Sequence, residues 1–178
     1  MSKFQNKYRI ESTRIPGYDY SNPNWYYVTI NTKNHYCYFG NILDGKMFLN
    51  DIGKLTEKFW QEIPVHFKTA EIDYYIIMPN HIHGIIIINE LPPLVETGHA
   101  PSLQEQTKRY SLSNIIGSFK SAVSNKIHKI GYNQFQWQPR FYERIIRNEK
   151  ELFRIRKYIE QNPLKWDIEK NNPENLEL

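Results

Sequence analysis

Two apolar segments separated by only two residues set the strongest limit on how this chain can fold. The segments Glu71–Met78 and His81–Asn89 are rich in isoleucine and have the length of strands. Only Pro79 and Asn80 lie between them. So short a connection joins antiparallel neighbours, because parallel strands need a crossover of a dozen or more residues. The sequence therefore predicts an antiparallel pair of strands in the middle of the chain.

Further strands and helices are predicted on both sides of this pair. Three segments repeat apolar residues at helical spacing, and two others are rich in β-branched and aromatic residues. We expect the following additional elements: a strand at Trp25–Asn31, which Tyr36–Phe39 extends or pairs with; a helix from Asn50 to about Ile63; a helix at Ser111–Ile130; a strand at Phe141–Arg147; and a last helix that a capping box of Asn148 and Glu151 opens and Pro163 ends. The order β-α-β-β-α-β-α fits an α+β fold with a ferredoxin-like, four-stranded antiparallel sheet, helices packed on one face, and a C-terminal helix.

Length and composition indicate one folded domain. A chain of 178 residues buries roughly 70% of the surface that it exposes when unfolded, and its 13 Tyr, 9 Phe and 4 Trp supply a core. We expect an irregular N-terminal lead-in at 1–24, a single domain at 25–166 with a mobile loop at about 91–109, and a short tail at 167–178.

Hydropathy and cysteine content exclude several other classes of protein. No apolar stretch approaches the roughly 20 residues that a transmembrane helix needs, and the charged N-terminus lacks the apolar centre of a signal peptide. Cys37 is the single cysteine, which excludes an internal disulfide and a zinc site built on cysteine pairs. We therefore expect a soluble, cytoplasmic protein.

Positive charge is concentrated in one stretch of the chain. Between Lys108 and Tyr158, twelve basic residues stand against three acidic ones, although the net charge of the whole chain is only +4. This asymmetry favours a face that binds a polyanion, because Lys and Arg contacts to phosphates release condensed counterions. Interleaved aromatic rings can stack on unpaired bases. The alternative is a set of solvated helix faces without a partner, with rings that belong to the core.

Two histidines form the sharpest local motif, in the segment MPNHIHG. In a strand, residues two apart point to the same face, so His81 and His83 project together. Two adjacent imidazoles can chelate a divalent cation. The alternative is two independently hydrogen-bonded histidines near a strand start. Two ligands leave a metal site incomplete, so a third must come from elsewhere in the chain.

The last helix carries a polar stripe. Arg154, Tyr158 and Asn162 follow one another at intervals of four residues, close to one line along the helix. The amide oxygen of Asn162 is a suitable ligand for magnesium or manganese, and nearby cations favour the phenolate of Tyr158, which makes covalent catalysis by this tyrosine chemically reasonable. On its own, Tyr158 is more typical of a packing residue on a helix flank.

Taken together, these segments resemble a known family. MPNHIHG, SLSNIIGSFKSAV, WQPRFYERIIR and RKYIEQNPLKW occur in this order and resemble the single-tyrosine HUH transposases, in particular the REP-associated tyrosine transposases of bacteria, over roughly 25–166. The resemblance implies a ferredoxin-like sheet that acts on single-stranded DNA at hairpins. It implies Tyr158 as the nucleophile, His81 and His83 as ligands of Mg²⁺ or Mn²⁺, and Asn162 as the third ligand, with Gln161 as the competing candidate.

The resemblance also implies a reaction and a partner. Attack of Tyr158 on a phosphodiester gives a 5′-phosphotyrosine intermediate and a free 3′-hydroxyl, so strands are nicked and then joined without ATP. A monomer is favoured over a homodimer. The residues expected to contact the DNA backbone are Lys120, Lys126, Arg140, Arg144, Arg147 and Arg154.

Two other functions remain open at this stage. A domesticated relative would bind hairpin DNA or RNA without cutting it, although such a protein has no need for His81, His83 and Tyr158 together. A metal-dependent hydrolase of a small substrate could use the same histidines, but the surrounding positive charge suits a long polyanion better.

Overall fold

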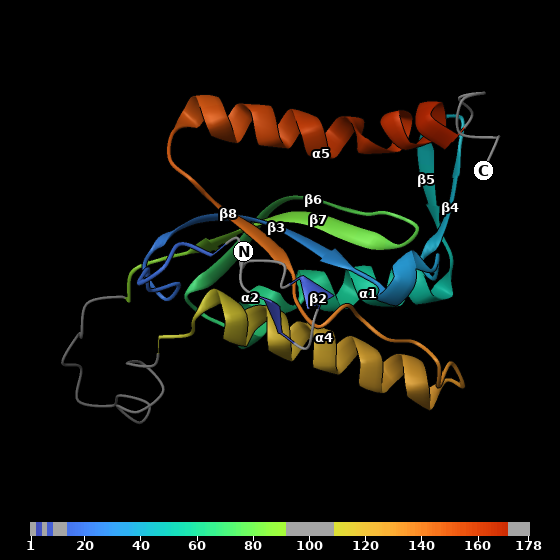
Figure 1. Ribbon diagram of the computed structural model, residues 1–178, viewed down its shortest axis with the longest axis horizontal. Coiled ribbons are helices and arrows are strands. Elements are labelled where there is room, and N and C mark those ends of the chain that lie inside the picture. The colour runs from blue at the N-terminus through green and yellow to red at the C-terminus, as the bar shows by residue number, and fades with distance from the viewer. Residues whose placement is uncertain (1–2, 5–6, 9–13, 92–108, 171–178) are drawn as a thin grey trace.

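A four-stranded antiparallel sheet forms the centre of the protein (Figure 1). In the computed structural model, which describes residues 3–4, 7–8, 14–91 and 109–170, the strands lie in the order β6-β7-β3-β8. Their bounds are β3 at Asn24–Asn31, β6 at Ala70–Ile77, β7 at His81–Ile88 and β8 at Tyr142–Ile146. β7 pairs with both β6 and β3, so the antiparallel pair predicted from the short Pro79-Asn80 link is confirmed.

Helices cover both faces of this sheet, in unequal numbers. α1 (Asp51–Gln61), the single-turn α2 (Ile63–His66) and α4 (Leu112–Lys129) lie on one face, whereas α5 (Glu149–Lys170) lies alone across the other (Figure 1). The expected α+β fold, with helices packed on one face and a separate C-terminal helix, is confirmed. Among the helices that the structure describes, none combines the length and the apolar character that crossing a membrane requires.

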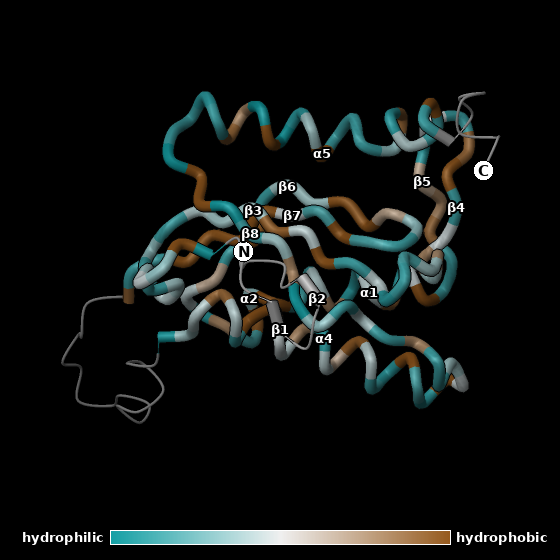
Figure 2. Tube along the Cα trace, in the orientation of Figure 1, coloured by the Kyte–Doolittle hydropathy of each residue, from teal (hydrophilic) through white to brown (hydrophobic). Residues whose placement is uncertain are grey.

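The alternation of side chains along the strands gives the sheet two different cores. Val28 and Ile82 belong to the larger core, under α1 and α4, whereas Tyr27 and Ile85 belong to the smaller core, under α5. Figure 2 shows hydrophobic residues concentrated in the strands, while α5 is hydrophilic along most of its length. The face of the sheet under α5 therefore has a smaller apolar core than the opposite face and accommodates polar groups.

Gly84 of β7 is required by close packing in the larger core. A Cβ atom at this position would lie 2.3 Å from the ring of Trp60, and that ring is completely buried. Real Cβ contacts are longer than this, so only glycine lets the Trp60 ring approach β7 this closely.

A second hairpin lies outside the main sheet, where the sequence predicted an extension of the first strand. Tyr36–Phe39 forms no strand; a short 3-10 helix at Lys33–His35 precedes it. β4 (Gly40–Leu43) and β5 (Lys46–Leu49) then pair with each other. Asp44 and Gly45 connect them with φ values of 50° and 67°, as the mirror-image turns that join tight hairpins require.

The expectation that Pro163 ends the last helix is wrong, because α5 continues to Lys170. A proline inside a helix removes one backbone hydrogen bond and costs roughly 3 kcal/mol. Contacts with the second hairpin offset part of this cost: Asp167 accepts a hydrogen bond from the amide of Gly45 at 3.0 Å, and Leu164 packs against Gly45.

Parts of the expected lead-in and tail have regular structure. β1 (Lys3–Phe4) and β2 (Lys7–Tyr8) pair with each other, and Tyr20 is buried in the larger core. Residues 92–108 of the expected loop and residues 171–178 of the expected tail lie outside the described residues.

Candidate active site

Strand pairing brings the polar residues of the α5 face into one row. Thr29 of β3 pairs directly with His83 of β7 and, on its other side, with Tyr142 of β8. Asn31 pairs with His81 in the same way. Because side chains that oppose each other across a ladder point to the same face, these groups all lie on the side of the sheet that α5 covers.

The two histidine rings lie close together on this face, with centroids 4.5 Å apart and an interplanar angle of 76°. Their Nε2 atoms are 3.0 Å apart. The Nδ1 atom of His81 lies 2.6 Å from the amide oxygen of Asn80, and the Asn80 amide nitrogen donates to the carbonyl of His35, which fixes the orientation of that amide. Since the oxygen can only accept, His81 carries its proton on Nδ1 and directs the lone pair of Nε2 toward His83.

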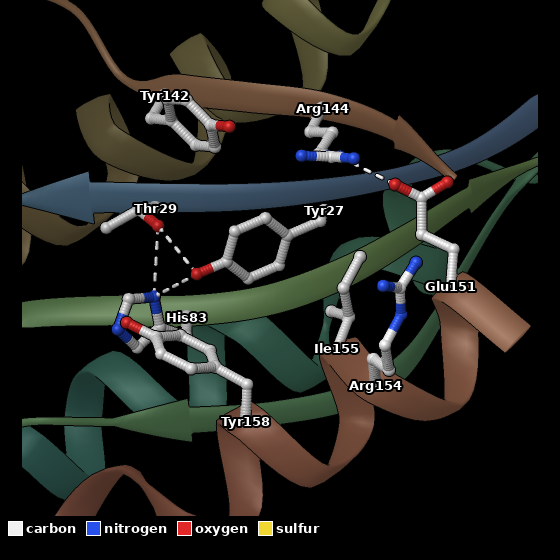
Figure 3. Close-up of a pocket in the computed structure, with 9 residues that line it drawn as sticks. All are labelled: Tyr27, Thr29, His83, Tyr142, Arg144, Glu151, Arg154, Ile155 and Tyr158. Atoms are coloured by element: carbon white, nitrogen blue, oxygen red, sulfur yellow. Dashed lines mark hydrogen bonds and ion pairs between the residues drawn. The ribbon is translucent and has the colours of Figure 1, made fainter. Parts of the chain in front are cut away.

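His83 has hydroxyl partners instead of an amide. Its Nδ1 atom lies 2.7 Å from the Tyr27 hydroxyl and 3.0 Å from the Thr29 hydroxyl (Figure 3). Hydroxyls both donate and accept, so they support either tautomer of this ring. When no cation is present, His83 can carry its proton on Nε2 and donate it to Nε2 of His81. When His83 carries its proton on Nδ1 instead, the Nε2 lone pairs of both rings are available to bind one cation.

Burial keeps both imidazoles neutral. Desolvation lowers the pKa of His81 to about 4, with a smaller contribution from the nearby His35. Desolvation and the proximity of His81 lower the pKa of His83 to about 3. Burial also raises the pKa of Tyr27, so its hydroxyl keeps its proton. At neutral pH the pair therefore offers uncharged nitrogen donors, the form that binds metals.

Helix α5 brings Tyr158 and Asn162 to the histidines. The centroid of the Tyr158 ring lies 5.2 Å from that of His83 at an interplanar angle of 68°, and the residue is 42% exposed. Asn162 follows one helical turn later, is 7% exposed, and lines a cavity of about 300 Å³ together with His81, His83 and Tyr158. Gln161 is exposed and does not line that cavity, so the geometry favours Asn162 over Gln161 as a third ligand.

The same side chains border a second, larger cleft. It has a volume of about 590 Å³ and shares Thr29, His83 and Tyr158 with the smaller cavity. Tyr158 therefore lines both spaces, with the ring of His83 beside it. Within the part of the chain that the structure describes, no group of three or more His, Cys, Asp or Glu side chains could hold a metal ion, so a cation here would depend on the two histidines and on an amide, water or substrate oxygen.

The six basic residues expected to contact DNA do not share one surface. Arg144 and Arg154 line the larger cleft beside Tyr158. Arg140 and Arg147 flank β8 and are exposed. Lys120 and Lys126 lie on α4, on the opposite side of the sheet from Tyr158 (Figure 1).

Lys120 has a structural contact. Its ammonium group donates to the backbone carbonyls of Gln138 and Pro139, and burial lowers its pKa. The structure thus brings Arg144 and Arg154 to the candidate site and keeps Lys120 and Lys126 away from it.

Several residues of the site were not singled out from the sequence. Tyr27 and Thr29 belong to a different strand from the histidines, and Glu151 contributes to the site as well as to the helix start. Asn80 lies directly before His81 in the tight link, and this position was the only local indication that it belongs to the site. The others depend on strand register, which the sequence does not show.

This chain is similar to one known protein in sequence and to another in structure. No family model matches it. In sequence it is similar to an uncharacterized protein of Haemophilus influenzae, with 36% identity over 163 residues that cover 88% of this chain and 89% of that protein. In structure it is similar to a REP-associated tyrosine transposase bound to a REP hairpin, with a TM-score of 0.51 and 19% identity, over 88% of this chain and 74% of the other. The chain therefore belongs to one family with the Haemophilus influenzae protein, and it has the fold of the REP-associated tyrosine transposase.

Proposed function

We propose that this protein is a transposase-type endonuclease that nicks single-stranded DNA at hairpins and transfers strands through Tyr158. The observation that carries the proposal is the position of Tyr158 against His83, where both residues line the two cavities. The cleft on one side is bordered by Arg144 and Arg154, which suits a phosphodiester chain. The transposase of similar fold is bound to a hairpin, which supports hairpin DNA as the substrate.

The proposed cofactor is Mg²⁺ or Mn²⁺, with His81, His83 and Asn162 as its protein ligands. The donor set fits such an ion: His81 presents a fixed nitrogen lone pair, His83 presents a second one in the tautomer that its hydroxyl partners support, and Asn162 offers an amide oxygen in the same cavity. When bound, the cation supplies positive charge that stabilises the charge developing on the phosphate.

The chain's own residues perform the transfer. The phenolic oxygen of Tyr158 bonds to phosphorus and releases its proton to water, which reaches the half-exposed side chain. The bond from phosphorus to the 3′ oxygen breaks, and that oxygen takes up a proton and leaves as a hydroxyl. Tyr158 then holds the 5′ phosphate. Attack by another 3′-hydroxyl reverses these changes and joins two strands, so the bond energy is conserved without ATP.

The arrangement supports a monomer. α5 lies across the sheet of its own chain, and Tyr158 contacts His83 of that same chain. The proposed site is therefore complete without a second copy. A homodimer that exchanges α5 between chains is the alternative, and size-exclusion chromatography with light scattering distinguishes the two.

The proposal is tested with hairpin-bearing DNA oligonucleotides from the flanks of the protein's own gene. Each is labelled at the 5′ or the 3′ end, incubated with Mg²⁺ or Mn²⁺, and analysed on a denaturing gel for wild type, Tyr158→Phe and His81→Ala. We expect a covalent adduct on the 3′-labelled fragment with wild type alone. Tight, salt-sensitive binding without any adduct would instead indicate a hairpin-binding protein that does not cleave.

A further inference from the structure

The larger cleft extends beyond the groups that the proposed reaction needs. From Tyr158 and His83 it continues along β8 and the start of α5, where Tyr142, Arg144 and Glu151 line it (Figure 3). Its volume of about 590 Å³ is shaped by aromatic and charged side chains together. Such a lining suits a nucleoside better than a phosphate alone, because a base offers both a flat apolar face and a polar edge.

Arg144 is held in this cleft by a carboxylate that is itself fixed. Its Nε donates to Glu151 Oε1 at 2.6 Å, and Glu151 Oε2 accepts the backbone amide of Arg147 at 3.0 Å. The Glu151 side chain is 8% exposed, whereas that of Arg144 is 58% exposed. The Arg147 amide and then the Arg144 guanidinium hold the pKa of Glu151 below its ordinary value. The guanidinium is therefore oriented by a buried, ionised anchor while it stays accessible from the cleft.

Stability alone does not account for this arrangement. An ion pair with one exposed partner contributes little to folding, because solvent screens it and because holding two side chains costs entropy. Its main effect is to fix the plane of the guanidinium in advance. A guanidinium group whose orientation is already fixed, with its N–H donors arranged as a fork, loses less entropy when it binds a planar partner.

Tyr142 provides an aromatic surface next to that fork. It stands two residues before Arg144 on β8, so both side chains point to the same face of the sheet. Tyr142 is 40% exposed, and its ring packs edge-on against the buried ring of Tyr27, with centroids 6.1 Å apart. An accessible ring supported from behind offers a stacking surface for a base.

We infer that this cleft binds the base of a nucleotide next to the scissile phosphate and that Arg144 selects guanine there. Guanine presents the two acceptors O6 and N7 that match a guanidinium fork, whereas adenine presents a donor in place of O6. Tyr142 stacks on the base, and Glu151 acts as a positioning residue for Arg144. This inference rests on the proposed function for the position of the scissile phosphate, at Tyr158, which lies two helical turns after Glu151 on α5.

Binding without cleavage tests the inference directly. Fluorescence anisotropy in EDTA measures the affinity of the full protein for a labelled oligothymidine that contains one guanine, one adenine or one 7-deazaguanine, which lacks N7. The single base can reach the cleft in some register of the flexible strand. We expect wild type to bind the guanine oligonucleotide about tenfold more tightly than the adenine one, and to lose most of that preference with 7-deazaguanine.

Variants separate base recognition from general attraction to DNA. Arg144→Lys keeps the charge and loses the planar guanidinium, so it should reduce the guanine preference and retain binding to plain oligothymidine. Glu151→Gln should reduce the preference, because it weakens the anchor of Arg144. Arg109→Lys makes the same chemical change at an exposed residue outside the cleft and should keep the preference.

Three results would overturn the inference. One is equal affinity of wild type for the guanine and adenine oligonucleotides, and another is an undiminished guanine preference in Arg144→Lys. The third is a uniform loss of affinity in Arg144→Lys with a smaller salt dependence, which would assign Arg144 to a phosphate. A guanine preference that depends on Arg144, in a protein that forms no covalent adduct, would support the base site and contradict the proposed function.

Discussion

The Nε2 atoms of His81 and His83 face each other across 3.0 Å. Asn80 fixes the proton of His81 on the opposite nitrogen, so a lone pair of His81 always points into this gap. Two such lone pairs repel each other unless a proton lies between them or both bind one cation that lies to the side of the line joining them. The hydroxyls of Tyr27 and Thr29 let His83 adjust to either occupant. This relationship is the structural basis for the proposed cation site, and it leads to specific expectations.

The first expectation concerns Asn162 as the third protein ligand of the proposed cation. Asn162→Ala should weaken Mn²⁺ binding by about tenfold or more, since removing even an outer partner of a metal ligand costs about 10–100-fold. Isothermal titration calorimetry measures the change. Gln161→Ala is the matched control, because Gln161 is the exposed neighbour of the buried Asn162. A larger loss of affinity in Gln161→Ala than in Asn162→Ala would show that the wrong amide was chosen.

The second concerns the hydroxyls behind His83. The double variant Tyr27→Phe with Thr29→Val leaves His83 Nδ1 without either of its partners. We expect Mn²⁺ affinity to fall about 10–100-fold, because nothing then holds the proton on Nδ1. Thr29→Ser keeps a hydroxyl and should bind Mn²⁺ nearly as wild type does. Unchanged affinity in the double variant, with an unchanged fold by circular dichroism, would contradict this role.

The third concerns the dependence of stability on pH in the metal-free protein. Burial lowers the pKa of His81 from 6.5 to about 4 and that of His83 from 6.5 to about 3. At pH values between the ordinary pKa of 6.5 and the lowered pKa of about 4 or 3, the unfolded chain binds more protons than the folded one. The free energy of unfolding therefore decreases as the pH falls below about 6.5. Urea denaturation at pH 7 and pH 4.5 measures the decrease. A variant with both histidines replaced by glutamine should show a smaller decrease, and parallel losses in the two proteins would exclude the histidines as the cause.

The fourth concerns the packing behind the site. Gly84→Ala forces a methyl group into the ring of Trp60 and should lower the free energy of unfolding by at least about 2 kcal/mol. Gly117→Ala is its control, since open space surrounds Gly117 in α4. That change should raise stability by about 0.5–1 kcal/mol, because alanine favours the helix. Equal effects of the two substitutions in thermal unfolding would contradict the packing argument.

The fold was predictable where the determining signals are local. The short link between β6 and β7 and the starts of α1 and α4 depend on residues within a few positions of each other, and each occurs as expected. The turn at Asp44-Gly45 was an equally local signal that the sequence interpretation did not use. The helix end predicted at Pro163 is wrong, because α5 makes contacts with the second hairpin beyond the proline and continues to Lys170.

The candidate site was predictable only in part, for a related reason. His81 and His83 share a face by strand geometry, and Tyr158 and Asn162 share a face by helix geometry, so both pairs could be derived from spacing. Tyr27 and Thr29 could not, since their place beside His83 depends on the register between β3 and β7. Charge counted along the chain grouped Lys120 with Arg144, but the sheet separates α4 from the site.

The covalent role proposed for Tyr158 is tested by identifying the residue that bonds to DNA. After reaction with a hairpin oligonucleotide and Mn²⁺, the protein is treated with nuclease and protease, and mass spectrometry locates the attached nucleotide. A single modified residue is expected, Tyr158, attached to the 5′ phosphate of the cleaved strand. A nucleotide attached to Tyr142 or Tyr27, which line the same cleft, or cleavage without any attached nucleotide, would contradict this role.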